Sequence, residues 1–188
     1  MVWLPERRQR GNPAPGSHSG RTLDEVQAPR LVATDVDGTL LDPDDRVTPR
    51  AAGVIGNVVS AGVEFVLVTG RPPRWIPPVT SQLPVARLAI CANGTVLYDA
   101  TADEVLWTRT LTPATLAELA EAVTATLPGC GLGVERIAVG AGAFDDVASQ
   151  FVAEPEYRHA WLGADHTVAS RPELLVEPAV KMLARCRS

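Results

Sequence analysis

Three short apolar runs in the first half of the chain each end in polar residues. They are residues 30–35 (RLVATD), 64–70 (EFVLVTG) and 87–94 (RLAICANG). Continuous apolar runs of this length are typical of strands that are buried on both faces. The pattern therefore predicts three buried strands, each with polar groups at its carboxyl end.

The segments between these runs have the features of helices. Residues 48–62 (TPRAAGVIGNVVSAG) begin with Thr48 and Pro49, a common helix start, and end at Gly62, a common helix stop. Residues 71–83 contain several prolines and leave room for a short helix only. Alternating strands and helices predict an α/β protein with a Rossmann-like parallel sheet and right-handed crossovers.

The pattern changes after the third strand. Residues 95–110 alternate apolar and polar positions and predict a β-hairpin. Residues 112–129 (TPATLAELAEAVTATLPG) predict a helix that is ended by Gly129. Its expected apolar stripe consists of Leu116, Leu119, Ala120, Val123 and Leu127. Residues 131–142 are strand-like, and an acidic and aromatic stretch follows them.

The chain divides into three parts by composition. Residues 1–29 are rich in proline, glycine, serine and arginine and lack periodicity, so we expect a disordered leader there. Residues 30–111 hold the strand and helix pattern of the predicted α/β core. Residues 112–188 form a second unit with its own helices and strands.

Composition narrows the classes of function. Hydrophobic residues make up 46% of the chain, enough for a packed core, and the net charge of −5 without a basic stripe argues against a nucleic-acid-binding protein. No apolar run has the length of a membrane span, so we expect no membrane partner. The three cysteines, Cys91, Cys130 and Cys186, form no C-x-x-C pair. This odd number favours a reducing, cytoplasmic setting over a disulfide framework, with Cys91 as a small buried apolar residue.

The densest group of reactive side chains follows the first predicted strand and consists of Asp35, Asp37, Gly38 and Thr39. Two carboxylates this close repel each other unless a divalent cation lies between them. One carboxylate can attack phosphorus to form an aspartyl-phosphate, and the other can transfer protons. A glycine beside them lets backbone N–H groups approach phosphoryl oxygens. The group therefore indicates phosphoryl transfer assisted by a divalent cation.

Polar residues at the other strand ends support the same site. Ligands bind beyond the carboxyl ends of parallel strands, so Asp35, Thr69 and Asn93 should converge on one crevice. Taken alone, residues 69–71 equally fit an ordinary turn after a strand, and residues 93–94 fit an ordinary hairpin turn.

Three segments in this order resemble one known family. DVDGTL (35–40), VLVTGRP (66–72) and ICANGTVLYD (90–99) are similar to motifs of the haloacid dehalogenase (HAD) superfamily of phosphohydrolases. The resemblance is closest to its Cof-type branch, in which an α/β cap of the C2B type is inserted after the third strand. It covers roughly residues 30–185 and implies a phosphatase that acts on a small-molecule phosphate ester, such as a sugar, nucleotide or cofactor phosphate.

The resemblance also implies roles for residues of the core. Asp35 would be the nucleophile and Asp37 the general acid and base, and Asp35 would hold Mg²⁺ together with the backbone of Asp37. Thr69 would bind the phosphoryl group. The remaining residues implied to line the phosphate site are Gly38, Gly70, Arg71 and Asn93.

Residues 112–188 would be the cap, which sets substrate choice in this family. Glu154, Tyr157 and His159 fall in this part and are candidates for substrate contacts. His159 otherwise reads as a surface residue, because the chain offers no set of ligands with metal-binding spacing.

Two further motifs of the family lack a clear counterpart. The family's third motif supplies a lysine, and Lys181 is either that lysine or a residue of a cap strand. The fourth motif is an acidic turn, and Asp145 and Asp146 are either its metal ligands or part of a solvated loop. We therefore expect the N-terminal part of a core with a partial cap. The strand that bears Asp35 would then be an exposed edge, open to self-association.

Other functions stay open on the sequence alone. The chain is alternatively a truncated, catalytically incomplete remnant, or a module that binds phosphate or a partner. Asp35 and Asp37 also fit positions of a Ca²⁺-binding loop, although the run before them is strand-like and not helical. A solvated acidic turn without chemistry is the remaining interpretation.

Overall fold

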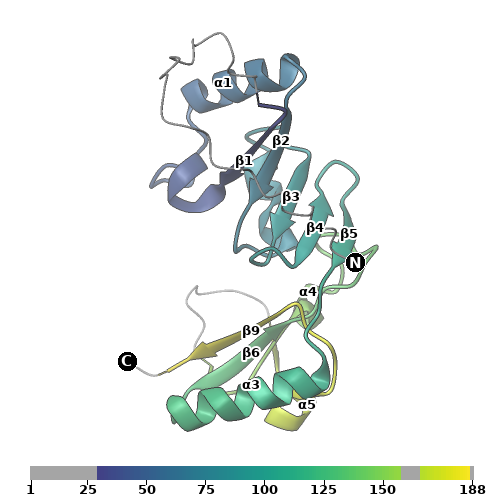
Figure 1. Ribbon diagram of the computed structural model, residues 1–188. Helices are drawn as coiled ribbons and strands as arrows, with labels where there is room; N and C mark the ends of the chain where they lie inside the picture. The colour runs from purple at the N-terminus through teal and green to yellow at the C-terminus, as the bar shows by residue number, and fades with distance from the viewer. Residues whose placement is uncertain (1–28, 158–165, 187–188) are drawn as a thin grey trace, which may run out of the picture.

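The computed structural model describes residues 29–157 and 166–186. These residues form two β-sheets with helices packed on them (Figure 1). The strand order is β1-β2-β3-β4-β5 in the first sheet and β8-β7-β6-β9 in the second. The predicted leader lies outside the described residues, apart from Pro29.

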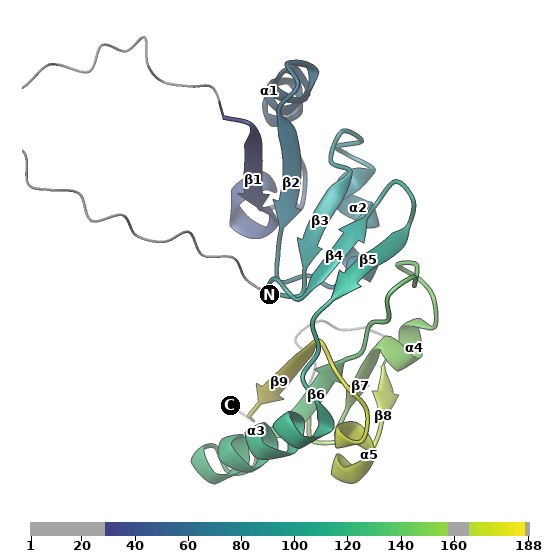
Figure 2. The ribbon, with the colours of Figure 1, turned by 45° about the vertical axis from the view of Figure 1, so that its right-hand side comes forward.

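The first sheet is built as the apolar runs predicted. Its strands are β1 (Leu31–Asp35), β2 (Glu64–Val68), β3 (Leu88–Cys91), β4 (Val96–Asp99) and β5 (Glu104–Thr108). Strands β1, β2 and β3 are parallel, whereas β4 and β5 form an antiparallel hairpin (Figure 2). In the register, Asp35 pairs with Val68, and Val68 pairs with Ile90. The carboxyl ends of the three parallel strands therefore lie level with one another.

The helices of this part begin where the sequence indicated. Helix α1 (Pro49–Ser60) is capped by Thr48, whose side chain accepts a hydrogen bond from the Ala51 N–H. The proline-rich segment forms only the 3-10 turn η3 (Pro73–Trp75) and the short helix α2 (Pro77–Thr80). Proline lacks an N–H donor, so it is tolerated in the first turn of a helix and stops a longer one.

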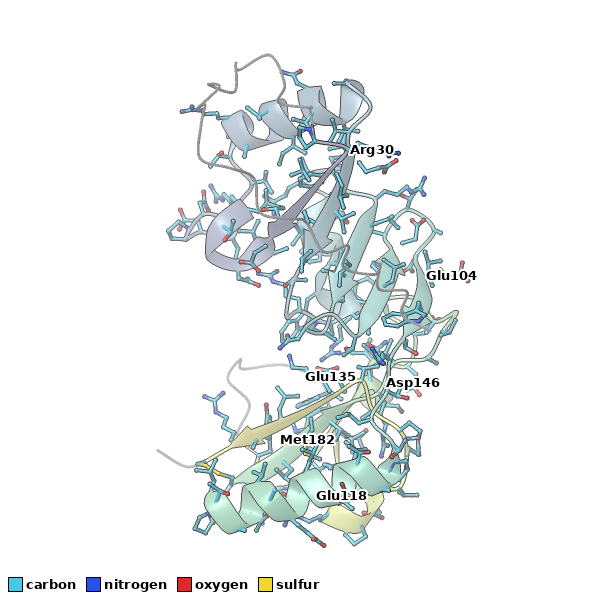
Figure 3. All side chains as sticks on the ribbon, viewed as in Figure 1. Arg30, Glu104, Glu118, Glu135, Asp146 and Met182 are labelled. Atoms are coloured by element: carbon cyan, nitrogen blue, oxygen red, sulfur yellow. A yellow bond between two sulfur atoms is a disulfide. The ribbon has the colours of Figure 1, made fainter. Side chains whose placement is uncertain are left out.

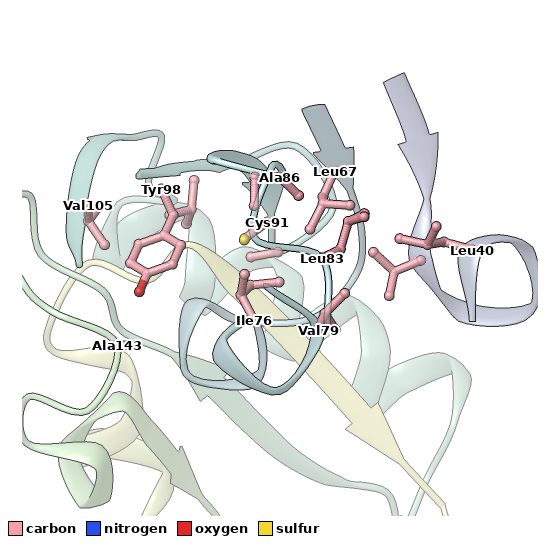
Figure 4. Close-up of a cluster of buried hydrophobic side chains, with 14 of the residues drawn as sticks. Leu40, Leu67, Ile76, Val79, Leu83, Ala86, Cys91, Tyr98, Val105 and Ala143 are labelled. Atoms are coloured by element: carbon pink, nitrogen blue, oxygen red, sulfur yellow. The ribbon is translucent and has the colours of Figure 1, made fainter. Parts of the chain in front are cut away.

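The core of the first sheet lies between the sheet and the η3–α2 segment (Figure 4). Leu67, Ile76 and Tyr98 are almost fully buried. The Tyr98 hydroxyl donates a hydrogen bond to Asp103 Oδ1 at 2.6 Å, which satisfies its one polar atom. Cys91 is buried as expected, and burial raises the pKa of its thiol to about 12.

Strand β1 lies at the edge of the first sheet, as predicted (Figure 2). Its alternate residues are exposed, with Leu31 at 54%. Helix α1 does not cover this edge strand well, because none of the helix residues is buried and Val54 is 55% exposed. The N-terminal edge of the core is therefore thinly covered in the described part of the chain.

The second sheet carries α3 and α5 on the face turned away from the first sheet, whereas the short helix α4 lies on the side of the first sheet (Figure 1). Its elements are α3 (Pro113–Thr126), β6 (Gly131–Glu135), α4 (Val147–Gln150), β7 (Phe151–Ala153), β8 (Thr167–Val168), α5 (Arg171–Leu175) and β9 (Lys181–Arg185). Leu116 and Ala120 of α3 pack with Leu132 of β6 and Leu174 of α5 in a second apolar cluster. This sheet therefore has its own core.

Two expectations for this part were too broad. Helix α3 ends at Thr126, and Leu119 and Leu127 are 39% and 48% exposed, because the sheet and α5 cover only a narrower stripe of the helix. The strand-like stretch 131–142 is a strand only over Gly131–Glu135. Beyond it the chain crosses to the first sheet, where the Val105 N–H donates a hydrogen bond to the Ala141 carbonyl.

The sequence favoured a reducing setting over a disulfide framework, but Cys130 and Cys186 form a disulfide. Gly131 and Arg185 are cross-strand partners in the β6–β9 pair, so the residues that flank them lie face to face. The two cysteines are 56 residues apart, so no local sequence pattern predicts that they pair. The prediction of a cytoplasmic location loses the support that it took from cysteine usage.

The described residues include no helix that is both long and apolar enough to cross a lipid bilayer.

Candidate active site

The ends of the three parallel strands surround a hollow of about 520 Å³. Asp35 ends β1, Thr69 follows β2, and Asn93 follows β3. The lining residues are Ala33, Thr34, Asp35, Val68, Thr69, Gly70 and Asn93. The structure thus brings together side chains that lie far apart in the sequence, at the edge where α/β sheets bind ligands.

The turn after β1, η2 (Val36–Leu40), presents Asp35 to solvent. Val36 and Leu40 are buried and anchor the turn, whereas Asp35 is exposed. Gly38 has a φ of 72°, a left-handed conformation that favours glycine. The turn brings the Thr39 hydroxyl back to Asp35, where it donates a hydrogen bond to Oδ2 at 3.1 Å. One carboxylate oxygen of Asp35 is therefore oriented by its own turn.

Asp37 is held by Arg71. The Arg71 Nη2 lies 2.6 Å from Asp37 Oδ1, and its Nε lies 3.1 Å from both carboxylate oxygens. Asp45 is a second acidic neighbour, with its Oδ1 3.4 Å from Nη2. The hydrogen bond to Asp37, aided by the charges of both acids, raises the pKa of Arg71 above its ordinary value although burial opposes this. The pairing orients the Asp37 carboxylate and ties the β1 turn to the β2 loop.

The loop after β2 packs tightly against the loop after β3. Thr69 is buried, and its hydroxyl accepts a hydrogen bond from the Arg71 N–H at 3.0 Å. A Cβ at Gly70 would lie 2.8 Å from Asn93 Oδ1, so only glycine fits there without displacement of Asn93. Asn93 itself has a φ of 62°, and its N–H donates to the Thr69 carbonyl at 3.1 Å. These contacts fix the shape of the hollow.

Lys181 reaches this site from β9 of the second sheet. Its Nζ donates to the Gly70 carbonyl at 3.2 Å and lies 3.5 Å from Asn93 Oδ1. The sequence left Lys181 either on a cap strand or at the catalytic site. In the structure, Lys181 belongs to strand β9 of the second sheet and also lies beside the hollow of the first.

Sequence reasoning missed the buried contact between Arg74 and Glu135. Two hydrogen bonds join them, from Nη1 to Oε2 at 2.7 Å and from Nη2 to Oε1 at 2.9 Å. Gln150 lies beside them, with its Oε1 3.5 Å from Arg74 Nη1, and all three residues are buried. Arg74 belongs to η3 and Glu135 ends β6, so the pair connects the two parts of the chain, and Figure 3 shows Glu135 between the two sheets. No local signal marks a pair that is 61 residues apart.

Glu154 is buried in the second unit, where its hydrogen-bond partners belong to the surrounding helix and strand. Its carboxylate accepts hydrogen bonds from Arg171 Nε at 2.6 Å and from the Leu132 N–H at 2.8 Å. Burial alone would raise the pKa of Glu154, but these two hydrogen bonds and the positive charge of Arg171 together lower it. Glu154 thus holds α5 against the sheet and does not join the hollow.

The other candidates of the second unit also lie apart from the hollow or outside the described residues. The Tyr157 ring packs against Phe151 with ring centroids 5.5 Å apart. Asp145 accepts a hydrogen bond from the Gly142 N–H at 2.8 Å, and Asp146 is the residue directly before α4. His159 lies outside the described residues.

The comparisons with known proteins agree with the geometry. The family model of haloacid dehalogenase-like hydrolases matches residues 32–171. The pyridoxal phosphate phosphatase YbhA of Escherichia coli K12 is 40% identical over 77 residues, which are 41% of this chain and 28% of that protein. The HMP-PP phosphatase of Serratia proteamaculans 568 is 40% identical over 70 residues, which are 37% of this chain and 26% of that protein.

A solved structure extends the likeness over more of the chain. The crystal structure of a hypothetical protein from Geobacillus kaustophilus HTA426 has a TM-score of 0.59 at 20% identity, and the match covers 86% of this chain and 59% of that one. The matched segments thus span about a quarter of the length of the curated relatives and over half of this solved chain. The Rossmann-like α/β fold and the resemblance to Cof-type enzymes are confirmed, and the chain belongs to the haloacid dehalogenase-like hydrolase family.

Proposed function

We propose that the chain acts as a phosphatase that hydrolyses a small-molecule phosphate monoester through an aspartyl-phosphate on Asp35. The observation that carries this proposal is the position of the exposed Asp35 carboxylate in a hollow shared with Thr69 and Asn93. A relative's printed activity, that of a pyridoxal phosphate phosphatase, supports a small phosphorylated cofactor as the substrate class.

The side chains suggest a division of labour. Asp35 attacks phosphorus, and the bond between phosphorus and the ester oxygen breaks. Asp37 gives a proton to the leaving alcohol and then takes one from the water that attacks the aspartyl-phosphate, which restores Asp35 and releases phosphate. Thr69 and the backbone around Gly38, Gly70 and Asn93 bind phosphoryl oxygens, and Arg71 orients Asp37.

The donor set at β1 fits Mg²⁺. This ion prefers oxygen ligands and is commonly held by one or two carboxylates together with substrate phosphate oxygens. Asp35 and the backbone carbonyl of Asp37 are donors of this kind. Bound Mg²⁺ would offset the negative charge that the nucleophile and the phosphoryl group bring together. Within the described residues, no group of three or more His, Cys, Asp or Glu gathers as a complete protein-only metal site.

We propose further that residues 112–188 form a cap over this site, because β9 contributes Lys181 at its rim. The second sheet faces the strand ends and carries α3 and α5 on its other side (Figure 1).

The first test is the hydrolysis of p-nitrophenyl phosphate by the purified chain, with and without Mg²⁺. Asp35→Asn should abolish Mg²⁺-dependent turnover, because an amide is not a nucleophile at phosphorus. Asp44→Asn is a matched control, since Asp44 is an exposed acid in the loop after the β1 turn. Substantial turnover by Asp35→Asn would rule out Asp35 as the nucleophile.

A second candidate function is a phosphate-binding module without turnover. It is favoured by the small number of acidic ligands that the described residues bring to β1. Turnover of p-nitrophenyl phosphate would exclude this alternative, whereas a folded chain that binds inorganic phosphate but hydrolyses no ester would fit it only. The structure argues against a Ca²⁺-binding loop of the helix–loop–helix type, because the strand β1, and not a helix, leads into Asp35.

A further inference from the structure

Lys181 of the second sheet contacts two residues that line the hollow of the first. Its Nζ contacts the Gly70 carbonyl and lies near Asn93 Oδ1, and both of these residues line the hollow. The ammonium therefore lies at the rim of the hollow, although its backbone belongs to the second sheet.

The charge of Lys181 is not neutralised by a neighbour. Arg71 is paired with Asp37 and Asp45, and Arg74 is paired with Glu135. Lys181, by contrast, forms no ion pair with any carboxylate in the described residues and touches only neutral oxygens. An ammonium with three N–H donors and two neutral acceptors retains the capacity to bind an anion.

The strand that carries Lys181 is held in position by a buried contact. Lys181 and Glu135 are directly opposite each other in the β6–β9 register, so their side chains project from the same face of the sheet. Met182 packs in the apolar cluster on the opposite face. Glu135 is fixed to the first sheet by Arg74, and Figure 3 shows it between the two sheets. The Arg74–Glu135 pair thus keeps the neighbouring lysine over the strand ends.

We propose that Lys181 is a phosphate-binding residue that the second unit contributes to the site on the first. Its ammonium donates a hydrogen bond to a phosphoryl oxygen of the bound ester, and the charge of the site is complete only when the two units are in contact. This inference rests on the proposed function, because it assumes that the hollow takes a phosphate group.

The first experiment measures the binding of inorganic phosphate in the presence of Mg²⁺ by titration calorimetry on the full chain. Lys181→Gln keeps a neutral donor for the Gly70 carbonyl and removes the charge, and it should weaken phosphate binding by about tenfold or more. Lys181→Arg should restore most of the affinity. Arg185→Gln is the matched control, since it removes one positive charge from the same strand and face, two side-chain pairs away, and should bind phosphate like the parent chain.

A second experiment uses the fact that Lys181 is the only lysine of the sequence. Acetylation with an N-hydroxysuccinimide ester, followed by peptide mass spectrometry, reports on this amine without any turnover. Bound phosphate should lower the rate of acetylation of Lys181 severalfold. The reference is the rate in a sulfate-free chloride buffer of equal ionic strength without phosphate.

The outcomes separate the two proposals. If the parent chain binds phosphate and Lys181→Gln binds it equally well, the role of Lys181 is wrong while the proposed function stands. If the parent chain neither binds phosphate nor turns over a phosphate ester, both are wrong. Phosphate binding that depends on the charge at position 181, with phosphate-dependent protection of the amine, would confirm the inference.

Discussion

At the scale of single residues, the candidate site depends on close backbone approach. Gly70 lies so near Asn93 that a Cβ would come within 2.8 Å of Asn93 Oδ1. Asn93 in turn is held by its N–H bond to the Thr69 carbonyl, in a left-handed conformation. The loops after β2 and β3 therefore act as one unit, and a methyl group between them should displace the side chain that lines the hollow.

Gly70→Ala should consequently lower phosphatase activity by about tenfold to a hundredfold, because displacement by about 1 Å at a reacting site has effects of this size. Gly53→Ala provides the control: an added Cβ there meets nothing within 4 Å, and alanine should stabilise α1 slightly. The measurement is kcat/KM for p-nitrophenyl phosphate together with a thermal unfolding curve. Unchanged activity in Gly70→Ala would show that the position of Asn93 is unimportant.

At the scale of elements, the contact between η3 and β6 joins the two sheets through charges. Arg74 and Glu135 form two short hydrogen bonds in a buried setting, beside Gln150. Such a pair adds little net stability compared with apolar side chains, but the loss of one partner leaves an uncompensated buried charge. The pair therefore contributes more to the relative orientation of the two sheets than to the free energy of their association.

Arg74→Met should reduce the free energy of unfolding by roughly 3–5 kcal/mol, since it leaves Glu135 buried without its partner. Arg87→Met is the comparison, because the Arg87–Asp99 pair is exposed on the arginine side and longer, at 3.6 Å, so its loss should cost less than about 1 kcal/mol. Urea unfolding monitored by circular dichroism measures both. Equal small effects would mean that the Arg74–Glu135 contact does not hold the sheets together.

At the scale of the whole molecule, the two edges of the first sheet differ. The β5 edge is covered, because Val105 exchanges backbone hydrogen bonds with Gly140 and Ala141 of the crossing loop. The β1 edge has no such cover in the described residues, and Leu31 and α1 leave apolar surface beside it. Unpaired edge strands of this kind are templates for pairing with another chain.

We therefore predict that the chain associates with itself as its concentration rises, through β1. Leu31→Lys places a charge on this edge and should shift sedimentation-velocity profiles towards the monomer. Leu106→Lys is a matched control on β5, where a leucine of similar exposure, 43%, lies on the covered edge. Association that is equally strong in both variants, or absent in the parent chain, would contradict the prediction.

The sequence alone determined the local part of this protein. The apolar runs placed three parallel strands, Thr48 and the prolines placed the helix starts, and Asp35, Thr69 and Asn93 were expected at neighbouring strand ends. These features were predictable because periodicity, capping and the alignment of parallel strands depend on residues close together in the chain.

Only the tertiary structure decided how the second unit meets the first. Lys181 contacts Gly70 across 111 residues, and the Arg74–Glu135 and Cys130–Cys186 pairs span 61 and 56 residues. Each depends on the register of β6 against β9 and on the packing of the two sheets, which leave no local pattern in the residues themselves. Short-range preferences therefore determined the strand ends that hold Asp35, whereas long-range packing decided that a lysine from the other sheet lies beside them.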